Sequence, residues 1–220
     1  VHGLDDGGAS AAPELARDPP GQVARRSVIM TGVTVIAHIS DLHVTGDPAR
    51  RARISAVVDH VNARAGGIDV LVVTGDITDD GTSAQNAEAA QILGAARGPT
   101  LVIPGNHDRR AEFSRALLDG NATDLPLNRS AVIGGVLYLM CDSTIPGRDD
   151  GWLSDASLEW MDAQILASGA DTPVVVCFHH PPVSLQMPFM DGIRQIEEGR
   201  LAQLIARYPN IVGSLCGHAH

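Results

Sequence analysis

The sequence lacks the features that mark several large classes of protein. No apolar run reaches about 18 residues, so no membrane span is expected, and no export signal is indicated. The three cysteines, Cys141, Cys177 and Cys216, lie in or beside apolar stretches without C-x-x-C spacing, which argues against disulfides and favours buried free thiols. The formal charge of −10 argues against a nucleic acid polymer or an anionic membrane as partner. We expect a cytoplasmic protein.

The length and composition predict one domain after an irregular start. A chain of 220 residues with 44% hydrophobic residues can bury one substantial core. Residues 1–29 are rich in Gly, Ala, Pro and Asp and have no periodicity, so we expect a disordered N-terminal extension. Met30 is a candidate start, and residues 30–220 are expected to form the domain.

The first half of the domain alternates between strand and helix patterns. Thr34–Ile39 is mostly apolar and β-branched, and short apolar runs recur at 70–73 and 101–103. Between these runs, apolar residues at helical spacing occupy 54–61 and 89–96. This βαβαβ order predicts a parallel sheet with right-handed crossovers.

The second half begins with a hairpin pattern. Two apolar segments, 130–133 and 136–140, flank Gly134-Gly135, which is typical of a two-residue turn. Ser154 is a candidate N-cap for the next helix. A strand at 174–176, a helix around 201–208 and a strand at 211–215 complete the pattern. A second, partly antiparallel sheet is therefore expected.

Five short polar clusters follow predicted strands. They are Asp41-Leu42-His43, Gly75-Asp76, Gly105-Asn106-His107-Asp108, His179-His180-Pro181-Pro182 and Gly217-His218-Ala219-His220. A single cluster of this kind is commonly a turn, a cap or a solvated site, but the carboxyl ends of strands in an open α/β sheet line one crevice. Asp, Asn and His gathered there indicate a divalent metal site. The glycines are expected to let the backbone turn sharply.

The ordered motifs resemble the calcineurin-like metallophosphoesterase superfamily, whose pattern is D-x-H, GD, GNH(D/E), H and GHxH. The resemblance covers about residues 33–220. Within the superfamily the chain is most similar to bacterial cyclic-nucleotide and glycerophosphodiester phosphodiesterases, through His38 to His43, Gly151-Trp152-Leu153 and the His179-His180-Pro181-Pro182 segment. A purple acid phosphatase would carry Tyr where this chain has Asp79.

The resemblance implies an α/β fold, a four-layer αββα sandwich of two mixed β-sheets flanked by helices. Members of the superfamily continue beyond the position of His220, so we expect residues 30–220 to lack the C-terminal strands. Homo-oligomerisation through parts beyond residue 220 is left open.

The resemblance also implies two divalent transition-metal ions, Mn, Fe, Zn or Co, with Asp76 bridging them. The first ion would be held by Asp41, His43, Asp76 and His220, and the second by Asp76, Asn106, His179 and His218. His180, next to His179, is an alternative ligand.

The implied activity is hydrolysis of a small-molecule phosphodiester, of cyclic-nucleotide or glycerophosphodiester type, through a metal-bound hydroxide. Asn106 and His107 would contact the substrate. His107 would stabilise developing charge or protonate the leaving oxygen, with Asp108 either orienting His107 or capping the following helix. The alternatives are a phosphomonoesterase or nucleotide hydrolase on the same core, and a non-catalytic metal-binding module.

Overall fold

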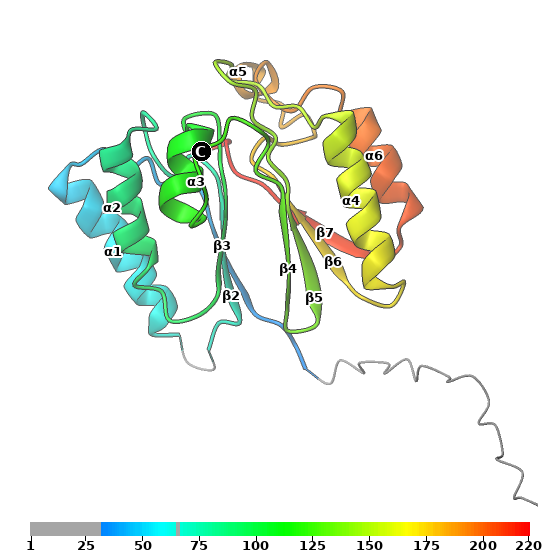
Figure 1. The fold of residues 1–220 in the computed structure, drawn as a ribbon, viewed down its shortest axis with the longest axis horizontal. Helices are drawn as coiled ribbons and strands as arrows, with labels where there is room; N and C mark the ends of the chain where they lie inside the picture. Colours follow the sequence, from blue (N-terminus) through cyan, green and yellow to red (C-terminus); the bar gives the residue numbers. More distant parts are fainter. Residues whose placement is uncertain (1–31, 65–66) are drawn as a thin grey trace, which may run out of the picture.

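Two β-sheets lie face to face at the centre of the molecule, and helices cover the outer face of each (Figure 1). The computed structural model describes residues 32–64 and 67–220. The extension expected at residues 1–29 and the candidate start Met30 lie outside the described residues. The α/β fold with two sheets flanked by helices, which the sequence predicted, is confirmed.

The first sheet is parallel and has the order β1-β2-β3. Asp47 caps the first helix through its side chain, and Pro48 occupies a position in the first turn where its missing N–H costs no hydrogen bond. Thr82 caps the second helix. The elements are β1 (Ile36–Ile39), α1 (Pro48–Asn62), β2 (Val70–Thr74), α2 (Ser83–Leu93), β3 (Thr100–Ile103) and α3 (Arg110–Leu117).

The second sheet is mixed and has the order β4-β5-β6-β7, with only the β4–β5 hairpin antiparallel among its pairs. Gly134 and Gly135 have φ values of +59° and +80°, which a tight hairpin turn requires and which side chains disfavour. The predicted hairpin is therefore confirmed, whereas two mixed sheets were expected and the first is parallel throughout its described strands. The elements are β4 (Arg129–Ile133), β5 (Val136–Met140), α4 (Asp155–Ser168), β6 (Val174–Cys177), α5 (Pro188–Asp191), α6 (Glu198–Arg207) and β7 (Ile211–Leu215).

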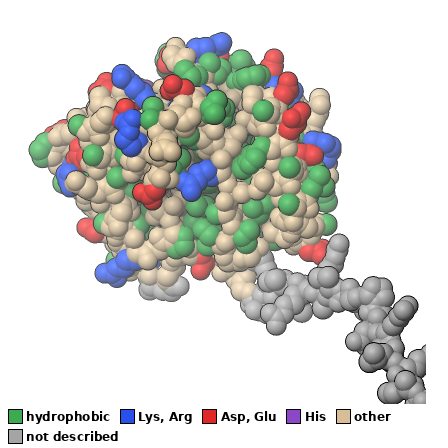
Figure 2. All heavy atoms as spheres, viewed as in Figure 1, with side chains coloured by type: hydrophobic (Ala, Val, Ile, Leu, Met, Phe, Trp, Pro, Cys, Tyr) green, Lys and Arg blue, Asp and Glu red, His purple; other side chains and the backbone are tan. Residues whose placement is uncertain are grey.

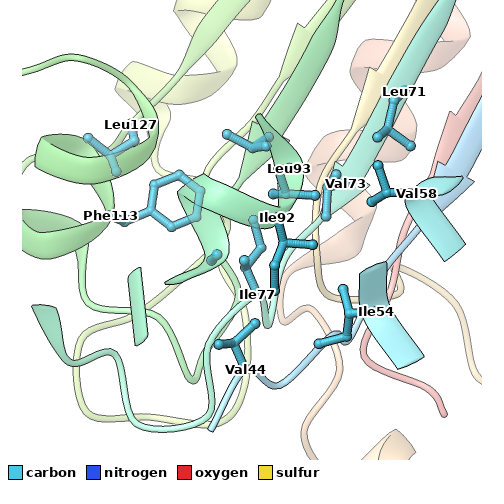
Figure 3. Close-up of a cluster of buried hydrophobic side chains, with 12 residues drawn as sticks. Val44, Ile54, Val58, Leu71, Val73, Ile77, Ile92, Leu93, Phe113 and Leu127 are labelled. Atoms are coloured by element: carbon cyan, nitrogen blue, oxygen red, sulfur yellow. The ribbon is translucent and has the colours of Figure 1, made fainter. Parts of the chain in front are cut away.

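Alternate side chains of the central strands point to opposite faces of the sheet and pack into different hydrophobic layers. On β2, Leu71 and Val73 pack against α1 and α2, as Figure 3 shows, while Val70 and Val72 face the other sheet. On β5, Leu139 and Leu137 pack toward α4 and α6, and the intervening residues fill the space between the sheets. Burial on both faces explains why these strands are almost wholly apolar in sequence.

The outer surface is mixed in character. Figure 2 shows acidic and basic side chains interspersed with hydrophobic ones on one face of the molecule. Among the described residues, no helix combines the length and the apolar character that a membrane crossing needs.

The layer between the second sheet and its helices gives a test of the packing. Leu139 is fully buried, so Leu139→Ala should lower the free energy of unfolding by about 3 kcal/mol, measured by urea denaturation. Leu166 on α4 is 66% exposed, and Leu166→Ala should change the free energy of unfolding by less than about 0.5 kcal/mol. Equal effects of the two substitutions would contradict this assignment of the core.

Candidate metal centre

The five polar clusters meet at the carboxyl ends of the strands they follow. The loop after β1 is joined to the loop after β2, because the backbone N–H groups of Asp41 and His43 donate to the carbonyls of Gly75 and Asp76 at 3.0 and 2.9 Å. The loop after β7 joins the same edge, since the N–H of His218 donates to the Asp41 carboxylate at 3.0 Å. Side chains from both sheets therefore converge.

One group of candidate ligands surrounds the imidazole of His43. Its Nε2 lies 3.2 Å from Nε2 of His220 and 3.8 Å from Oδ2 of Asp76. Nε2 of His220 lies 3.5 Å from Oδ1 of Asp41. The structure thus brings together the four residues that the resemblance assigned to a first ion.

A second group surrounds the imidazole of His179. Its Nε2 lies 3.3 Å from Oδ2 of Asp76, 3.1 Å from Oδ1 of Asn106 and 3.2 Å from Nδ1 of His218. His180 is fully buried, and its Nδ1 forms a hydrogen bond with the Ser143 hydroxyl at 2.8 Å. His179, rather than His180, therefore faces Asp76, although the rings of His180 and His218 are only 4.8 Å apart between centroids.

The donor atoms of both groups suit divalent transition metals. Imidazole nitrogens, carboxylate oxygens and an amide oxygen form the set, and the Asp41, His43, His220 atoms lie within 4.8 Å of one another, as do those of Asp41, Asp76 and His179. Ligand atoms bound about 2.0–2.2 Å from one ion would show similar separations. Asp76 belongs to both groups, as a bridging carboxylate would.

Hydrogen bonds fix which nitrogen of two imidazoles faces the centre. Nδ1 of His179 donates to the Thr74 carbonyl at 2.7 Å, and Nδ1 of His43 bonds to the Asp79 carboxylate at 3.0 Å. Carbonyl and carboxylate oxygens accept hydrogen bonds, so Nδ1 carries a proton and Nε2 is the atom left to face the centre. Both rings are thus oriented as metal ligands commonly are.

The electrostatics of the centre favour an ionised Asp76. Burial alone would raise the pKa of this carboxyl, but the hydrogen bond and charge of His179, together with the His107 N–H, hold the pKa below its ordinary value. Burial, and the neighbouring His179 and His218, lower the pKa of His180 well below its usual range. The centre therefore contains a carboxylate and, beside it, a neutral imidazole.

Four of the candidate ligands have an unusual backbone conformation. Asp41, His43, Asp76 and His218 have φ values of +56°, +46°, +48° and +72°. Left-handed conformation at such residues is uncommon and is tolerated where surrounding structure enforces it, often at functional sites. The backbone hydrogen bonds between the loops supply that constraint.

The glycines beside the ligands serve two different purposes. Gly75 has φ of +88°, as the expected sharp turn requires. Gly105 and Gly217 do not have positive φ, although the backbone turns at both: the Asp108 N–H donates to the Gly105 carbonyl at 3.1 Å and the Ala219 N–H to the Gly217 carbonyl at 2.9 Å. A Cβ on Gly105 would lie 2.2 Å from Oδ1 of Asp76, and one on Gly217 would lie 2.8 Å from Oδ2 of Asp41. These two glycines are needed because carboxylates approach the backbone closely.

The two residues after Asn106 differ from expectation in part. The exposed ring of His107 donates through Nδ1 to the Asp79 carbonyl at 2.7 Å, and its backbone N–H donates to Oδ1 of Asp76 at 3.0 Å. Asp108 neither bonds the His107 ring nor caps α3. Its carboxylate instead accepts hydrogen bonds from backbone N–H groups of Gly105, Ile77 and Thr78 and from the Thr78 hydroxyl, which hold the two loops together.

A cavity of about 520 Å³ adjoins the centre and shares Asn106 and His107 with it. Its wall includes residues 144–147 and Asp149, on the loop that follows β5. The further lining residues are Asp79, Asp80, Asp108, Arg109, Arg110 and Asp124.

Sequence reasoning missed some residues that support the ligands. Asp79 holds His43, and Ser143 holds His180, but neither lies in a recognisable spacing. An acidic pair after a strand is typical of a turn, so Asp79-Asp80 carried no separate signal.

The chain is similar in sequence to known phosphoesterases. A family model described as calcineurin-like phosphoesterase matches residues 34–220. The chain is 36% identical over 197 residues to glycerophosphodiester phosphodiesterase GpdQ of Enterobacter lignolyticus, covering 84% of this chain and 70% of that protein. It is 29% identical to the cAMP/cGMP dual specificity phosphodiesterase MT0825 of Mycobacterium tuberculosis, covering 84% of this chain and 61% of that one.

Among solved structures, purple acid phosphatase PPD1 from yellow lupin matches with a TM-score of 0.61 at 15% identity, over 85% of this chain and 38% of that chain. At this identity the match supports the fold alone.

The close approach at Gly105 predicts a selective defect. In Gly105→Ala the added methyl group would lie 2.2 Å from Oδ1 and 2.4 Å from the backbone nitrogen of Asp76, and 2.8 Å from Nε2 of His179. It must therefore displace two candidate ligands, and the affinity for Mn²⁺ should fall about tenfold or more, measured by calorimetric titration. Gly213→Ala is the control, because nothing lies within 4 Å of the added carbon. Unchanged Mn²⁺ affinity in a folded Gly105→Ala protein would refute the role given to Asp76.

Proposed function

The chain belongs to the calcineurin-like phosphoesterase family of metal-dependent phosphoric ester hydrolases, and we propose that it hydrolyses a phosphodiester at a centre of two divalent metal ions. The observation that carries the proposal is the Asp76 carboxylate, whose Oδ2 lies 3.8 Å from Nε2 of His43 and 3.3 Å from Nε2 of His179. One carboxylate thus belongs to two sets of donors.

The ligand sets divide between the two ions. Asp41, His43, Asp76 and His220 would hold the first, and Asp76, Asn106, His179 and His218 the second; Mn, Fe, Zn and Co all suit such mixed nitrogen and oxygen donors. When bound, the ions supply Lewis-acid activation of the phosphate and of water. The protein orients the imidazoles through Asp79 and the Thr74 carbonyl, so that their Nε2 atoms are already aimed at the centre.

His107 and Asn106 contact the substrate in this proposal. Both line the cavity beside the centre, and Nδ1 of His107 is anchored on the Asp79 carbonyl. Burial opposes protonation, but that hydrogen bond and the charges of Asp76, Asp79 and Asp108 raise the pKa of His107. Nε2 of His107 can therefore donate a hydrogen bond to developing charge or a proton to the leaving oxygen. Asp108 is a positioning residue that acts through its backbone contacts.

The cavity favours a diester over a monoester. Asp79, Asp80, Asp124 and Asp149 line it, against the exposed Arg109 and the partly buried Arg110, whose charge is paired with Asp142. A phosphomonoester carries a charge of about −1.5 to −2 at neutral pH, whereas a diester carries one negative charge and is repelled less. Among the described residues, the lining contains no Phe, Tyr or Trp, which leaves only His107 and Arg109 to stack on a base and favours a glycerophosphodiester over a cyclic nucleotide.

The proposed activity predicts Mn²⁺-dependent hydrolysis of bis(p-nitrophenyl) phosphate, with p-nitrophenyl phosphate hydrolysed more slowly. Asp76→Asn should abolish diester turnover, because a neutral amide cannot serve as the anionic bridge, while Asp171→Asn, in an exposed loop, should leave it unchanged. The number of metal ions bound per chain is measured for the unmodified protein and for both variants.

The alternatives give different results in the same assay. Hydrolysis of the monoester alone would replace the proposal with a phosphomonoesterase or nucleotide hydrolase. Bound metal without turnover of a broad panel of esters would make the chain a non-catalytic metal-binding module.

The role of His107 predicts a second result. His107→Ala should lower kcat for the diester by about 10²- to 10⁴-fold, because the donor to the leaving oxygen is lost, while the number of bound metals stays the same. The control is His60→Ala, on the exposed part of α1. Loss of metal in His107→Ala would instead assign the residue to the ligand shell.

A further inference from the structure

The Arg110 side chain joins three separate segments beside the cavity. Its Nε donates to Oδ2 of Asp142 at 2.7 Å, and its two terminal nitrogens donate to the carbonyls of Asp124 at 3.0 Å and Thr144 at 2.8 Å. The side chain of Arg110 is 11% exposed and that of Asp142 is fully buried, so this ion pair is shielded from solvent.

Two of the three acceptors of Arg110, Asp142 and Thr144, lie at the base of the loop that forms the cavity wall, and the third, Asp124, lies on the segment before β4. Asp142 also accepts hydrogen bonds from the N–H and the hydroxyl of Thr144, at 2.9 and 2.7 Å. Thr144 pairs with Gly151 in an isolated bridge, which closes the loop between them. Four residues of this loop, 145–147 and 149, line the cavity.

A second segment of the cavity lining is also connected to Arg110. α3 begins at this residue, three positions after His107, which lines the cavity together with the loop. One guanidinium therefore connects the segment that carries His107 to the wall at 144–149. The donors of a guanidinium are spread over a planar fork and can reach three separated acceptors, whereas the three donors of a lysine radiate from a single nitrogen.

We propose that Arg110 is a positioning residue that sets the width of the cavity and thereby the size of the second ester group that the enzyme accepts. The inference rests on the proposed phosphodiesterase activity. Arg110 itself lines the cavity, but it does not contact the candidate ligands in the described hydrogen bonds and ion pairs; two of its three acceptors, Asp142 and Thr144, lie at the base of the wall.

The test uses Arg110→Lys, which keeps the charge beside Asp142 but releases the carbonyl contacts. Two diesters with the same leaving group are compared, bis(p-nitrophenyl) phosphate and methyl p-nitrophenyl phosphate. KM for the large diester should rise about tenfold, as expected for the loss of one or two hydrogen bonds that support its binding wall. KM for the methyl ester and both kcat values should change less than about threefold, with metal content unchanged.

Arg148→Lys is the matched control, because Arg148 lies in the same loop, is exposed and pairs only with Asp150 in the described contacts. It should leave both KM values unchanged. If Arg110→Lys does not fold, the double variant Arg110→Gln/Asp142→Asn removes both buried charges together and takes its place in the same measurements.

Amide hydrogen exchange of residues 144–151 provides a readout that needs no activity. Exchange should be faster in Arg110→Lys than in Arg148→Lys, and unchanged exchange would overturn the proposal, as would an equal rise of KM for both diesters. If the unmodified protein hydrolyses neither diester, the proposed function fails, whereas the exchange result still decides whether Arg110 holds the wall.

Discussion

The site depends on a carboxylate that is buried and yet ionised. Asp76 is 2% exposed, and burial of a charge is costly unless partners compensate for it. The His107 N–H satisfies one oxygen, and the other faces the imidazoles of His43 and His179. Gly75 allows the chain to enter the turn, and Gly105 leaves room for the carboxylate. The neighbouring loops are thus arranged around the position of this one group.

Packing of the two sheets creates the centre. The first sheet supplies Asp41, His43, Asp76 and Asn106, and the second supplies His179, His218 and His220. The hydrophobic layer between the sheets, with Val72 and Tyr138 fully buried, fixes their separation. At the edge of that layer, the His179 imidazole donates to the Thr74 carbonyl and so ties the sheets together within the site itself. A change in the packing of this core would therefore shift the candidate ligands of one sheet relative to those of the other.

The sequence predicted most of the strands and the residues that converge, because period-two and period-3.6 patterns and the ends of strands are local properties. It did not predict contacts that join distant residues without a motif. Arg110 and Asp142 are 32 positions apart, and an arginine after a polar cluster resembles any surface residue. The contacts of Asp108 were missed for the same reason, since the N–H groups of Ile77 and Thr78 that donate to its carboxylate lie on another loop. The left-handed backbone at His43 has no local sequence signal, because tertiary hydrogen bonds enforce it.

The hydrogen bonds of the imidazoles favour cations at the centre on grounds independent of any family. Because Nδ1 of His179 donates to a carbonyl and Nδ1 of His43 is bound by the Asp79 carboxylate, Nε2 of each ring is directed inward. Both Nε2 atoms face the Asp76 carboxylate, and Nε2 of His43 also lies 3.2 Å from Nε2 of His220. Electron-rich atoms at such separations repel one another unless a proton or a metal ion lies between them. Protons could neutralise single contacts, but one metal ion satisfies three or four donors together, and the Asp76 carboxylate is shared between the two groups of donors.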